Sequence, residues 1–254
     1  MPIRSKRKES RFVRVPPPPQ HILQLKVSLR YIKPPIWRRI LVPDNLPLGD
    51  LHYAIYPAMG WYGYHMHCFR FGGGFNPIEY ASSETVEDCG PAIRHEDSVV
   101  LSQVIKRKGQ TFSYEYDFGD GWQHEIKVEK LIPYDTAMRL PVCLAGARAC
   151  PPEDCGGVRG YYHALEVLER ASTPDEKSFR EWLGNYDPEY FDLEAINQQL
   201  QPRKLPMHPH AKLSDLIDNL LRSHGPVTSH SLSRKRATGS MRFTTARMRM
   251  KASG

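Results

Sequence analysis

The sequence has few cysteines and no long apolar run. Five Cys among 254 residues is an odd number, and no secretory leader precedes them, which favours reduced thiols over a disulfide framework. No apolar run approaches the ~20 residues needed to cross a bilayer. The first ten residues, MPIRSKRKES, are basic and lead into RFVRVPPPPQ rather than into the apolar core of a signal peptide. We therefore expect a cytoplasmic protein with no membrane contact.

Several sequence motifs of well-known enzyme classes are missing. The chain contains no G-x-x-x-x-G-K-[ST] loop, no Rossmann glycine pattern after a strand and no G-x-S-x-G elbow. Nucleotide-driven and serine-hydrolase chemistry are thereby excluded. Hydrophobic residues at 40% and aromatic residues at 10% are close to globular averages. A wholly disordered or fibrous chain is excluded as well, and the length fits one fair-sized domain or two small ones.

Acidic residues are too few to balance the basic ones. The 28 Asp+Glu against 35 Lys+Arg leave a net charge of +7. This excess lies at the two ends: residues 1–19 hold six basic residues and one acidic, and residues 203–254 hold eleven and two. Residues 20–202 are left with 18 basic and 25 acidic residues. The sequence thus predicts an acidic domain between two basic extensions, and any phosphate contact is expected in the extensions.

The two extensions also lack the patterns of a packed core. Residues 1–19 end in the run Pro16 to Pro19 and are predicted to be a disordered basic arm with a polyproline spacer. Residues 203–254 are predicted to be a basic, mostly disordered tail with one short helix near 214–223. Both extensions could contact nucleic acid, or they could simply be solvated.

Residues 20–202 are predicted to form one α+β domain. Alternating apolar residues predict strands, and apolar residues at helical spacing predict helices. The expected strands cover 23–29, 36–42, 64–71 and a hairpin over 111–132, and the expected helices cover 48–59, 159–170, 174–183 and 189–200. We therefore expect a mixed or antiparallel sheet with hairpins in the first part of the core, and helices packed from the C-terminal part.

The hairpin has the clearest pattern. Gly119, Asp120 and Gly121 provide the turn. If Phe118 pairs with Trp122, the register sets Tyr116 opposite His124, Tyr114 opposite Ile126 and Glu115 opposite Glu125.

Two histidines on the predicted strand 64–71 are candidate metal ligands. His65 and His67 are two residues apart, so both would project to one face. Such a pair can supply two nitrogens of a metal site, with His124 or a carboxylate from a neighbouring strand as the third ligand. Alternatively, the histidines pack in an aromatic layer and bond to backbone or Tyr hydroxyls.

Acidic and cysteine side chains supply further candidates. Asp117 and Asp120 flank the hairpin turn, and Glu153 and Asp154 precede a helix. With His124, these acids could form a cluster for a divalent cation, Zn²⁺ or Mn²⁺, suited to phosphodiester hydrolysis. Turn chemistry and the helix dipole also explain acids at these places. Cys143, Cys150 and Cys155 could hold structural zinc or be buried thiols.

Four motifs, in order along the chain, resemble the plasmid pRiA4b ORF-3-like family. They are W-x-x-x-H-x-H-x-F from Trp61, Y-x-Y-D-F-G-D-G-W-x-H-E-I from Tyr114, the Cys143 to Tyr161 segment with PPEDCGG, and D-P-E-x-F-D-L from Asp187. The resemblance covers about residues 21–200 and implies a compact α+β domain that is often carried on plasmids or insertion elements. The family motif positions in this chain are His65, His67, Asp117, Asp120, Trp122, His124, Glu153, Asp154 and Cys155.

The sequence supports three functional hypotheses. In the first, the protein is a non-enzymatic, mobile-element-associated binding or accessory module, whose basic extensions contact nucleic acid and whose motif-rich face binds a ligand or protein partner. That face comprises His65, His67, Asp117, Asp120, Trp122, His124, Glu153 and Asp154. In the second, a His and carboxylate cluster makes the protein a metal-dependent hydrolase of phosphate esters. In the third, the motif residues are purely structural.

Overall fold

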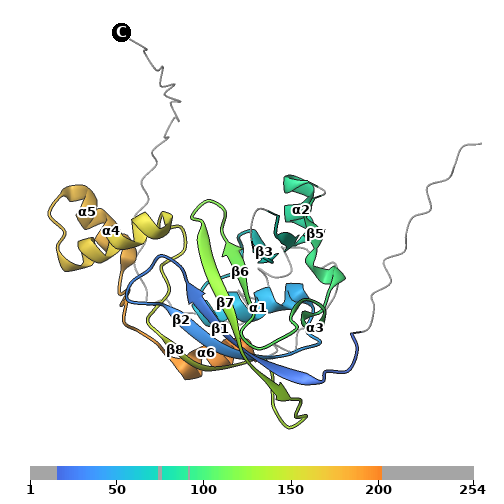
Figure 1. Cartoon of the computed structure of the whole chain (residues 1–254). Helices are drawn as coiled ribbons and strands as arrows, with labels where there is room; N and C mark the ends of the chain where they lie inside the picture. Colours follow the sequence, from blue (N-terminus) through green and yellow to red (C-terminus); the bar gives the residue numbers. More distant parts are fainter. Residues whose placement is uncertain (1–15, 74–75, 91, 202–254) are drawn as a thin grey trace, which may run out of the picture. The chain divides into compact units, whose positions relative to one another are not determined.

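The computed structural model describes residues 16–73, 76–90 and 92–201. The described residues form an α+β fold built on one eight-stranded sheet, in the order β5-β4-β3-β6-β7-β1-β2-β8 (Figure 1). All neighbouring strands are antiparallel except β4 and β5. The strands are β1 His21–Leu29, β2 Trp37–Pro43, β3 His67–Phe71, β4 Ile78–Ala81, β5 Arg94–His95, β6 Thr111–Tyr116, β7 Trp122–Pro133 and β8 Val142–Ala147. The predicted fold class is confirmed, whereas residues 1–15 and the helix expected near 214–223 lie outside the described residues.

The centre of the sheet follows directly from the alternating sequence. In β1, Leu23, Leu25 and Val27 are buried and belong to the main core cluster. β1 pairs with β2 on one side and β7 on the other, with Leu25 opposite both Ile40 and Val128. Two long neighbours make β1 a central strand, so its apolar face lies in the core.

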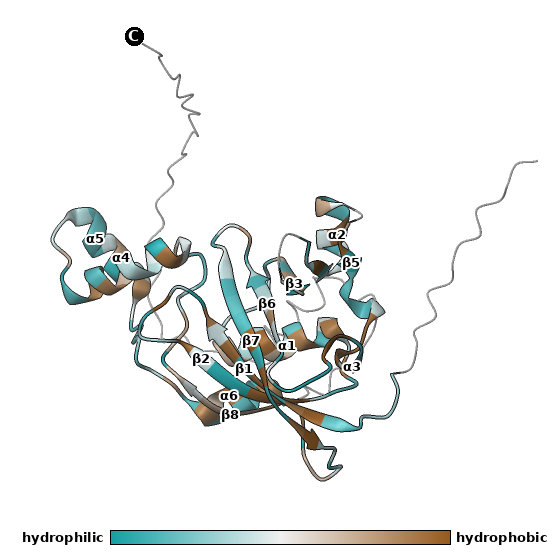
Figure 2. Cartoon of the chain, viewed as in Figure 1, coloured by the Kyte–Doolittle hydropathy of each residue, from teal (hydrophilic) through white to brown (hydrophobic). Residues whose placement is uncertain are grey.

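Helices cover the sheet and extend from it. They are α1 Leu48–Met59, α2 Ser83–Cys89, η1 Glu96–Ser98, α3 Leu101–Val104, α4 Gly157–Glu169, α5 Pro174–Leu183 and α6 Leu193–Leu200. α1 contacts β2 and α6, and α6 contacts β8. Figure 2 shows apolar residues along β1 and α1 and many polar residues on α5. No helix within the described ranges is long and apolar enough to span a membrane.

The hairpin register differs from the prediction by two residues. Tyr116 pairs with Trp122 and Tyr114 with His124, so the connection runs from Asp117 to Gly121. The cause is Asp117, which has a φ of 57° and whose Oδ1 accepts hydrogen bonds from the backbone amides of Gly119 and Asp120. Asp tolerates this left-handed conformation better than most residues, and it starts the turn two residues earlier than expected.

The corrected register also removes a predicted charge repulsion. Glu115 lies opposite Gln123 rather than Glu125. Its carboxylate is instead paired with Arg70 of β3, which also bonds Glu79 of β4 at 2.5 Å. The three charges therefore form one ion-pair group across three adjacent strands.

Two further differences concern segments near the candidate site. The strand expected over 64–71 begins only at His67, so His65 lies in the loop between α1 and β3. The edge strand β8 over Val142–Ala147 is not among the expected strands. His65 and His67 therefore do not share one strand face, and the prediction that they do is wrong.

Candidate functional site

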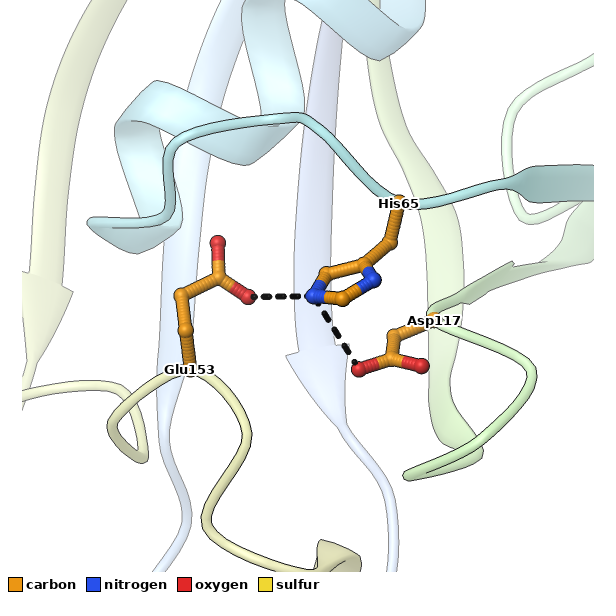
Figure 3. Close-up of side chains that lie close together, drawn as sticks. All are labelled: His65, Asp117 and Glu153. Carbon is orange, nitrogen blue, oxygen red and sulfur yellow. Dashed lines mark ion pairs between the residues drawn. The ribbon is translucent and has the colours of Figure 1, made fainter. Parts of the chain in front are cut away.

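The loops at one end of the sheet bring one histidine and three carboxylates together. His65 comes from the loop before β3, Asp117 from the turn after β6, and Glu153 and Asp154 from the loop between β8 and α4. Figure 3 shows the His65 ring between the carboxylates of Asp117 and Glu153. Within the described ranges, His65, Asp117 and Glu153 are the one group whose potential metal-ligand atoms all lie within 4.8 Å of one another. We call these three residues and Asp154 the His65 cluster.

One atom of His65 faces all three carboxylates. His65 Nε2 lies 3.5 Å from Asp117 Oδ2, 3.7 Å from Glu153 Oε2 and 3.3 Å from Asp154 Oδ1. The side chains of Asp117 and Glu153 are buried, whereas that of Asp154 is 61% exposed. The cluster thus has a closed inner side and an open side at Asp154.

The second oxygen of each carboxylate is held by the protein. Asp117 Oδ1 accepts the two turn amides described above. Glu153 Oε1 accepts hydrogen bonds from the Tyr62 backbone amide at 2.8 Å and the Tyr116 hydroxyl at 3.0 Å. Asp154 Oδ2 accepts one from the Tyr64 hydroxyl at 3.1 Å. Each carboxylate is therefore oriented through one oxygen and presents the other to the same point.

The turn after β6 and the loop before α4, which carry the acids, contact each other directly. Asp120 Oδ2 accepts a hydrogen bond from the Gly156 amide at 3.2 Å. A Cβ at Gly157, whose φ is 67°, would lie 2.4 Å from the Asp120 carbonyl oxygen. Asp154, like Asp117, has a φ of 57°. Left-handed conformations at non-glycine residues cost energy and concentrate at functional sites, so two of them in one cluster favour a functional role.

The electrostatics of the cluster are unbalanced. Burial raises the pKa of Glu153, and the nearby Asp154 charge adds to this effect, while the Tyr62 amide, the Tyr116 hydroxyl and His65 oppose it. His65 Nε2 and Glu153 Oε2 are buried and have no hydrogen-bond partner. Among residues 16–73, 76–90 and 92–201, no lysine or arginine forms an ion pair with these carboxylates. Buried carboxylates normally have a cationic partner, and here the position between them is suited to one.

Comparison with known proteins places the chain in a family. The model of the plasmid pRiA4b ORF-3-like protein family matches residues 21–195, a span that contains the whole His65 cluster. The chain belongs to the plasmid pRiA4b ORF-3-like family. The uncharacterized protein y4hQ of Sinorhizobium fredii (strain NBRC 101917 / NGR234) is 35% identical over 179 residues, which cover 69% of this chain and 86% of that protein.

A solved structure from an archaeon has the same fold. The crystal structure of MM3350 from Methanosarcina mazei Go1, described as a protein of unknown function, matches with a TM-score of 0.62 and 37% sequence identity. The match covers 70% of this chain and 98% of that chain. The family and its relatives therefore establish the fold, and the activity has to be argued from the site.

His67, the second histidine of the family motif, lies in a different group. Its Nε2 is 2.8 Å from Glu96 Oε2, and its ring is stacked on that of His52 with centroids 3.7 Å apart. His52 Nδ1 is in turn 2.7 Å from the Tyr114 hydroxyl. Burial and the neighbouring His67 lower the pKa of His52 to about 2, so the His52 ring is neutral. Sequence patterns gave no signal for the involvement of His52 or Glu96.

His124 and Trp122 are fully buried in the aromatic core. His124 Nδ1 donates to the Tyr114 carbonyl oxygen at 3.2 Å, and the ring packs edge-on against Trp61. Burial lowers the pKa of His124 to about 4. The structure thus brings neither His67 nor His124 into the His65 cluster. The side chains that face His65 Nε2 are the carboxylates of Asp117, Glu153 and Asp154.

The cysteines are separate from the His65 cluster. All five are free, and Cys143, Cys150 and Cys155 are buried. In the part of the chain that the structure describes, these three do not form a group with metal-ligand spacing. Burial raises the pKa of the Cys143 thiol, and it raises the pKa of the Cys150 and Cys155 thiols to about 12.

A groove opens beside the exposed side of the cluster. It has a volume of about 580 Å³, and Glu153 and Asp154 lie in its wall. Its one basic lining residue, Arg38, is buried and donates to the carbonyl oxygens of Trp37, Ala58, Ala147 and Arg148. Six aromatic rings line this aromatic groove: Tyr62, Tyr64, Trp182, Tyr186, Tyr190 and Phe191.

Proposed function

We propose that the domain is a divalent-metal-dependent hydrolase of phosphate esters, with the metal ion held by the His65 cluster. The observation that carries the proposal is the convergence of one imidazole nitrogen and three carboxylate oxygens on one point that no described lysine or arginine pairs with. Two of these atoms, His65 Nε2 and Glu153 Oε2, are buried without a hydrogen-bond partner. A cation held by His65, Asp117 and Glu153 would satisfy the buried His65 Nε2 and Glu153 Oε2. The exposed carboxylate of Asp154 would lie beside the ion rather than bind it.

The donor set fits the ions that the sequence favours. One imidazole and carboxylate oxygens suit Zn²⁺ or Mn²⁺, whereas Cys ligands would be expected for a closed structural zinc site. The hydrogen bonds to the second oxygens of Asp117 and Glu153 would act as an outer shell that fixes the ligand orientation. Because Asp154 lies on the open side, the ion would keep room there for water and substrate.

A metal ion held by His65, Asp117 and Glu153 would lower the pKa of a bound water and neutralise charge on the phosphoryl oxygens. Asp154 Oδ1 is placed to accept the proton of the attacking water. The water oxygen would bond to phosphorus, the bond from phosphorus to the ester oxygen would break, and the leaving oxygen would take up the proton that Asp154 received. Arg38 is fully engaged by backbone carbonyls, so the ion would be the cation that faces the substrate.

The first test is metal analysis of the purified full-length chain. We expect about one equivalent of Mn²⁺ or Zn²⁺ and a rise in Tm when the metal-free protein is reloaded. Glu153→Gln should weaken metal binding by more than the roughly 10- to 100-fold typical of outer-shell changes. Glu166→Gln, an exposed glutamate of α4, is the matched control and should bind normally. Absence of metal binding by the wild-type chain contradicts the proposal.

The second test separates metal binding from chemistry. Asp154→Asn should retain the metal and lose hydrolysis of a phosphate ester by roughly 100-fold or more, the usual contribution of a general base. Equal activity of Asp154→Asn and wild type would assign Asp154 no catalytic role. A metal-loaded wild-type chain that hydrolyses no phosphate ester would reject the reaction and leave only the metal site.

A second candidate function, nucleic-acid binding, is favoured by a row of like charges on the sheet. Lys26 of β1 lies opposite both Arg39 of β2 and Lys127 of β7. Lys108 and Lys130 line the same hollow of about 640 Å³ as Arg39 and Lys127, against the one acidic lining residue Glu129. Glu129 pairs with Arg39 through two hydrogen bonds at 2.6 and 3.0 Å. Lys26, Lys127 and Lys130 have no acidic ion-pair partner among the described residues, so their surface is suited to phosphates.

The basic extensions predicted from the sequence would add to that surface. Binding to DNA or RNA is expected to fall steeply with salt. The double change Lys127→Glu and Lys130→Glu in the full chain should weaken it, whereas Lys177→Glu on α5 should not. If neither deletion of 203–254 nor the double change alters binding, neither the C-terminal extension nor the surface at Lys127 and Lys130 contacts nucleic acid.

A further inference from the structure

The aromatic groove collects exposed rings that most proteins bury. Tyr62 is 77% exposed, Tyr64 60%, Tyr190 58% and Trp182 53%. These four are the exposed aromatic residues that line the groove, and they come from the loop before β3, from α5 and from the loop before α6. Exposed aromatic faces gathered around one concave surface indicate a binding site for an apolar or planar group.

Trp182 ends a stack of parallel rings. His163 of α4 is stacked on Phe179 of α5 with centroids 5.5 Å apart and an interplanar angle of 7°. Phe179 is stacked on Trp182 with centroids 5.4 Å apart and an angle of 11°. One face of Trp182 is thus occupied, and the residue is still half exposed at the groove. A planar ring in the groove could continue this stack, as bases do on aromatic side chains.

The groove and the His65 cluster are joined through Tyr64. Its ring is nearly parallel to that of Tyr62, with centroids 6.1 Å apart, and its hydroxyl holds Asp154. A ligand in the groove therefore lies next to the open side of the cluster.

Charge divides the site into two parts. Two charged side chains of the groove wall outside the His65 cluster are engaged within the protein: Arg38 by backbone carbonyls, and Asp192 by the Ala195 amide and the Tyr190 hydroxyl. No free cation is left in the described wall of the groove to bind an anion. The anionic part of a substrate would be held at the metal ion, and the neutral, planar part would lie on the rings.

We propose that the aromatic groove binds the base of a nucleotide, whose phosphate then lies at the metal ion of the His65 cluster. This inference rests on the proposed function for the phosphate, whereas the ring contact stands by itself. A volume of about 580 Å³ is of the size that encloses small ligands. The base can come from a free nucleotide or from the end of a single strand, which have the same ring and phosphate chemistry.

The ring contact is tested without metal, by NMR titration of the full-length, metal-free chain with adenosine and with ribose. Adenosine should bind and ribose should not. Trp182→Ala should weaken adenosine binding by roughly tenfold or more, as expected for one stacked base. Tyr31→Ala is the control, because Tyr31 is an exposed tyrosine that does not line the groove. Equal binding of adenosine and ribose, or an unchanged affinity in Trp182→Ala, overturns the inference.

The phosphate contact is tested separately, with AMP and ribose 5-phosphate on the Mn²⁺-loaded chain. AMP should bind more tightly than adenosine only when Mn²⁺ is present, and Trp182→Ala should reduce the preference for AMP over ribose 5-phosphate. If adenosine binds but Mn²⁺ adds nothing for AMP, the proposed hydrolase fails while the groove stands. Tighter binding of a short oligonucleotide than of AMP supports a strand as the source of the base, and equal binding supports a free nucleotide.

Discussion

Asp154 lies with Oδ1 3.3 Å from His65 Nε2 while its other oxygen accepts a hydrogen bond from the Tyr64 hydroxyl. Asp117 and Glu153 also use one oxygen within the protein and direct the other at His65, although Asp117 comes from a different loop than Glu153 and Asp154. A purely structural acid would be expected to use both oxygens within the protein or to turn one to solvent. The repeated arrangement is the physical basis for treating these loops as one metal site.

Asp117 has a local role that can be separated from its charge. Asp117→Asn keeps a side chain that tolerates a φ of 57° and can accept the turn amides, so stability should change little. Asp117→Ala loses both and should lower the free energy of unfolding by about 1 to 3 kcal/mol. Urea denaturation measures the difference. Asp135 is the control position for the same Asn and Ala substitutions, because its Oδ1 also accepts a backbone amide two residues on, that of Ala137, but in an exposed turn.

Both substitutions should also impair metal binding, because each removes a charged ligand. The control variants at Asp135 should bind metal normally. A metal affinity in Asp117→Asn equal to that of wild type would show that Asp117 orders the turn and does not contact the ion.

The pKa of Glu153 predicts a pH dependence of the metal-free protein. Burial raises this pKa above its ordinary value, so the folded chain holds a proton that the unfolded chain has released. Stability should therefore fall as pH rises from about 4 through the raised pKa. Thermal unfolding in the presence of a chelator measures the fall. Glu153→Gln should remove this component, and an unchanged pH profile in that variant would contradict the prediction.

His124 should act on stability in the opposite direction. Its pKa of about 4 in the folded protein lies below the ordinary value of 6.5, so the folded state disfavours the charged ring. The contribution of the neutral His124 ring to the free energy of unfolding is full above about pH 6.5. It is lost as pH falls towards 4, at a cost of roughly 3 kcal/mol.

The variant His124→Asn keeps a donor for the Tyr114 carbonyl oxygen and does not titrate. It should be less stable than wild type at neutral pH because of the lost volume, yet its stability should depend less on pH in this range. An equally steep acid dependence in His124→Asn would assign the effect to other groups.

The contact between the turn and the loop can be broken at a single glycine. Gly157→Ala would combine a φ of 67° with a Cβ only 2.4 Å from the Asp120 carbonyl oxygen. Gly109→Ala is the control, since Gly109 has a φ of 81° and nothing within 4 Å of its Cβ position. The control should cost about 1 to 2 kcal/mol, and Gly157→Ala should cost more and also weaken metal binding. Equal costs would mean that the loop moves away freely.

The sequence predicted the fold better than the site, for identifiable reasons. Strand β1 follows from local periodicity. Helix α5, expected over 174–183, also has local start signals, because Thr173 caps it and Pro174 is its first residue. The hairpin register depends on the left-handed backbone of Asp117. The sequence did not indicate this conformation, because Gly119 and Gly121 already explained a turn. A pairing assumed from the glycines alone was therefore shifted by two residues.

The candidate site joins residues that are far apart in sequence. The acids and His65 were individually recognised, but the expected strand wrongly included His65, and so it was grouped with His67. The start of β3 at His67 and the close approach of Gly157 to Asp120 decide which residues meet. Such long-range contacts leave no periodic signal in one sequence, and neither did the pairing of His67 with Glu96.

X-ray absorption spectroscopy of the metal-loaded, full-length chain identifies the atoms that bind the ion. We expect nitrogen and oxygen ligands at about 2.0 to 2.2 Å, with the multiple-scattering signature of an imidazole, and loss of bound metal in Glu153→Gln. Sulfur at about 2.3 Å would place the ion on the cysteines instead. That result, or a chain that binds no divalent metal, would contradict the proposed site.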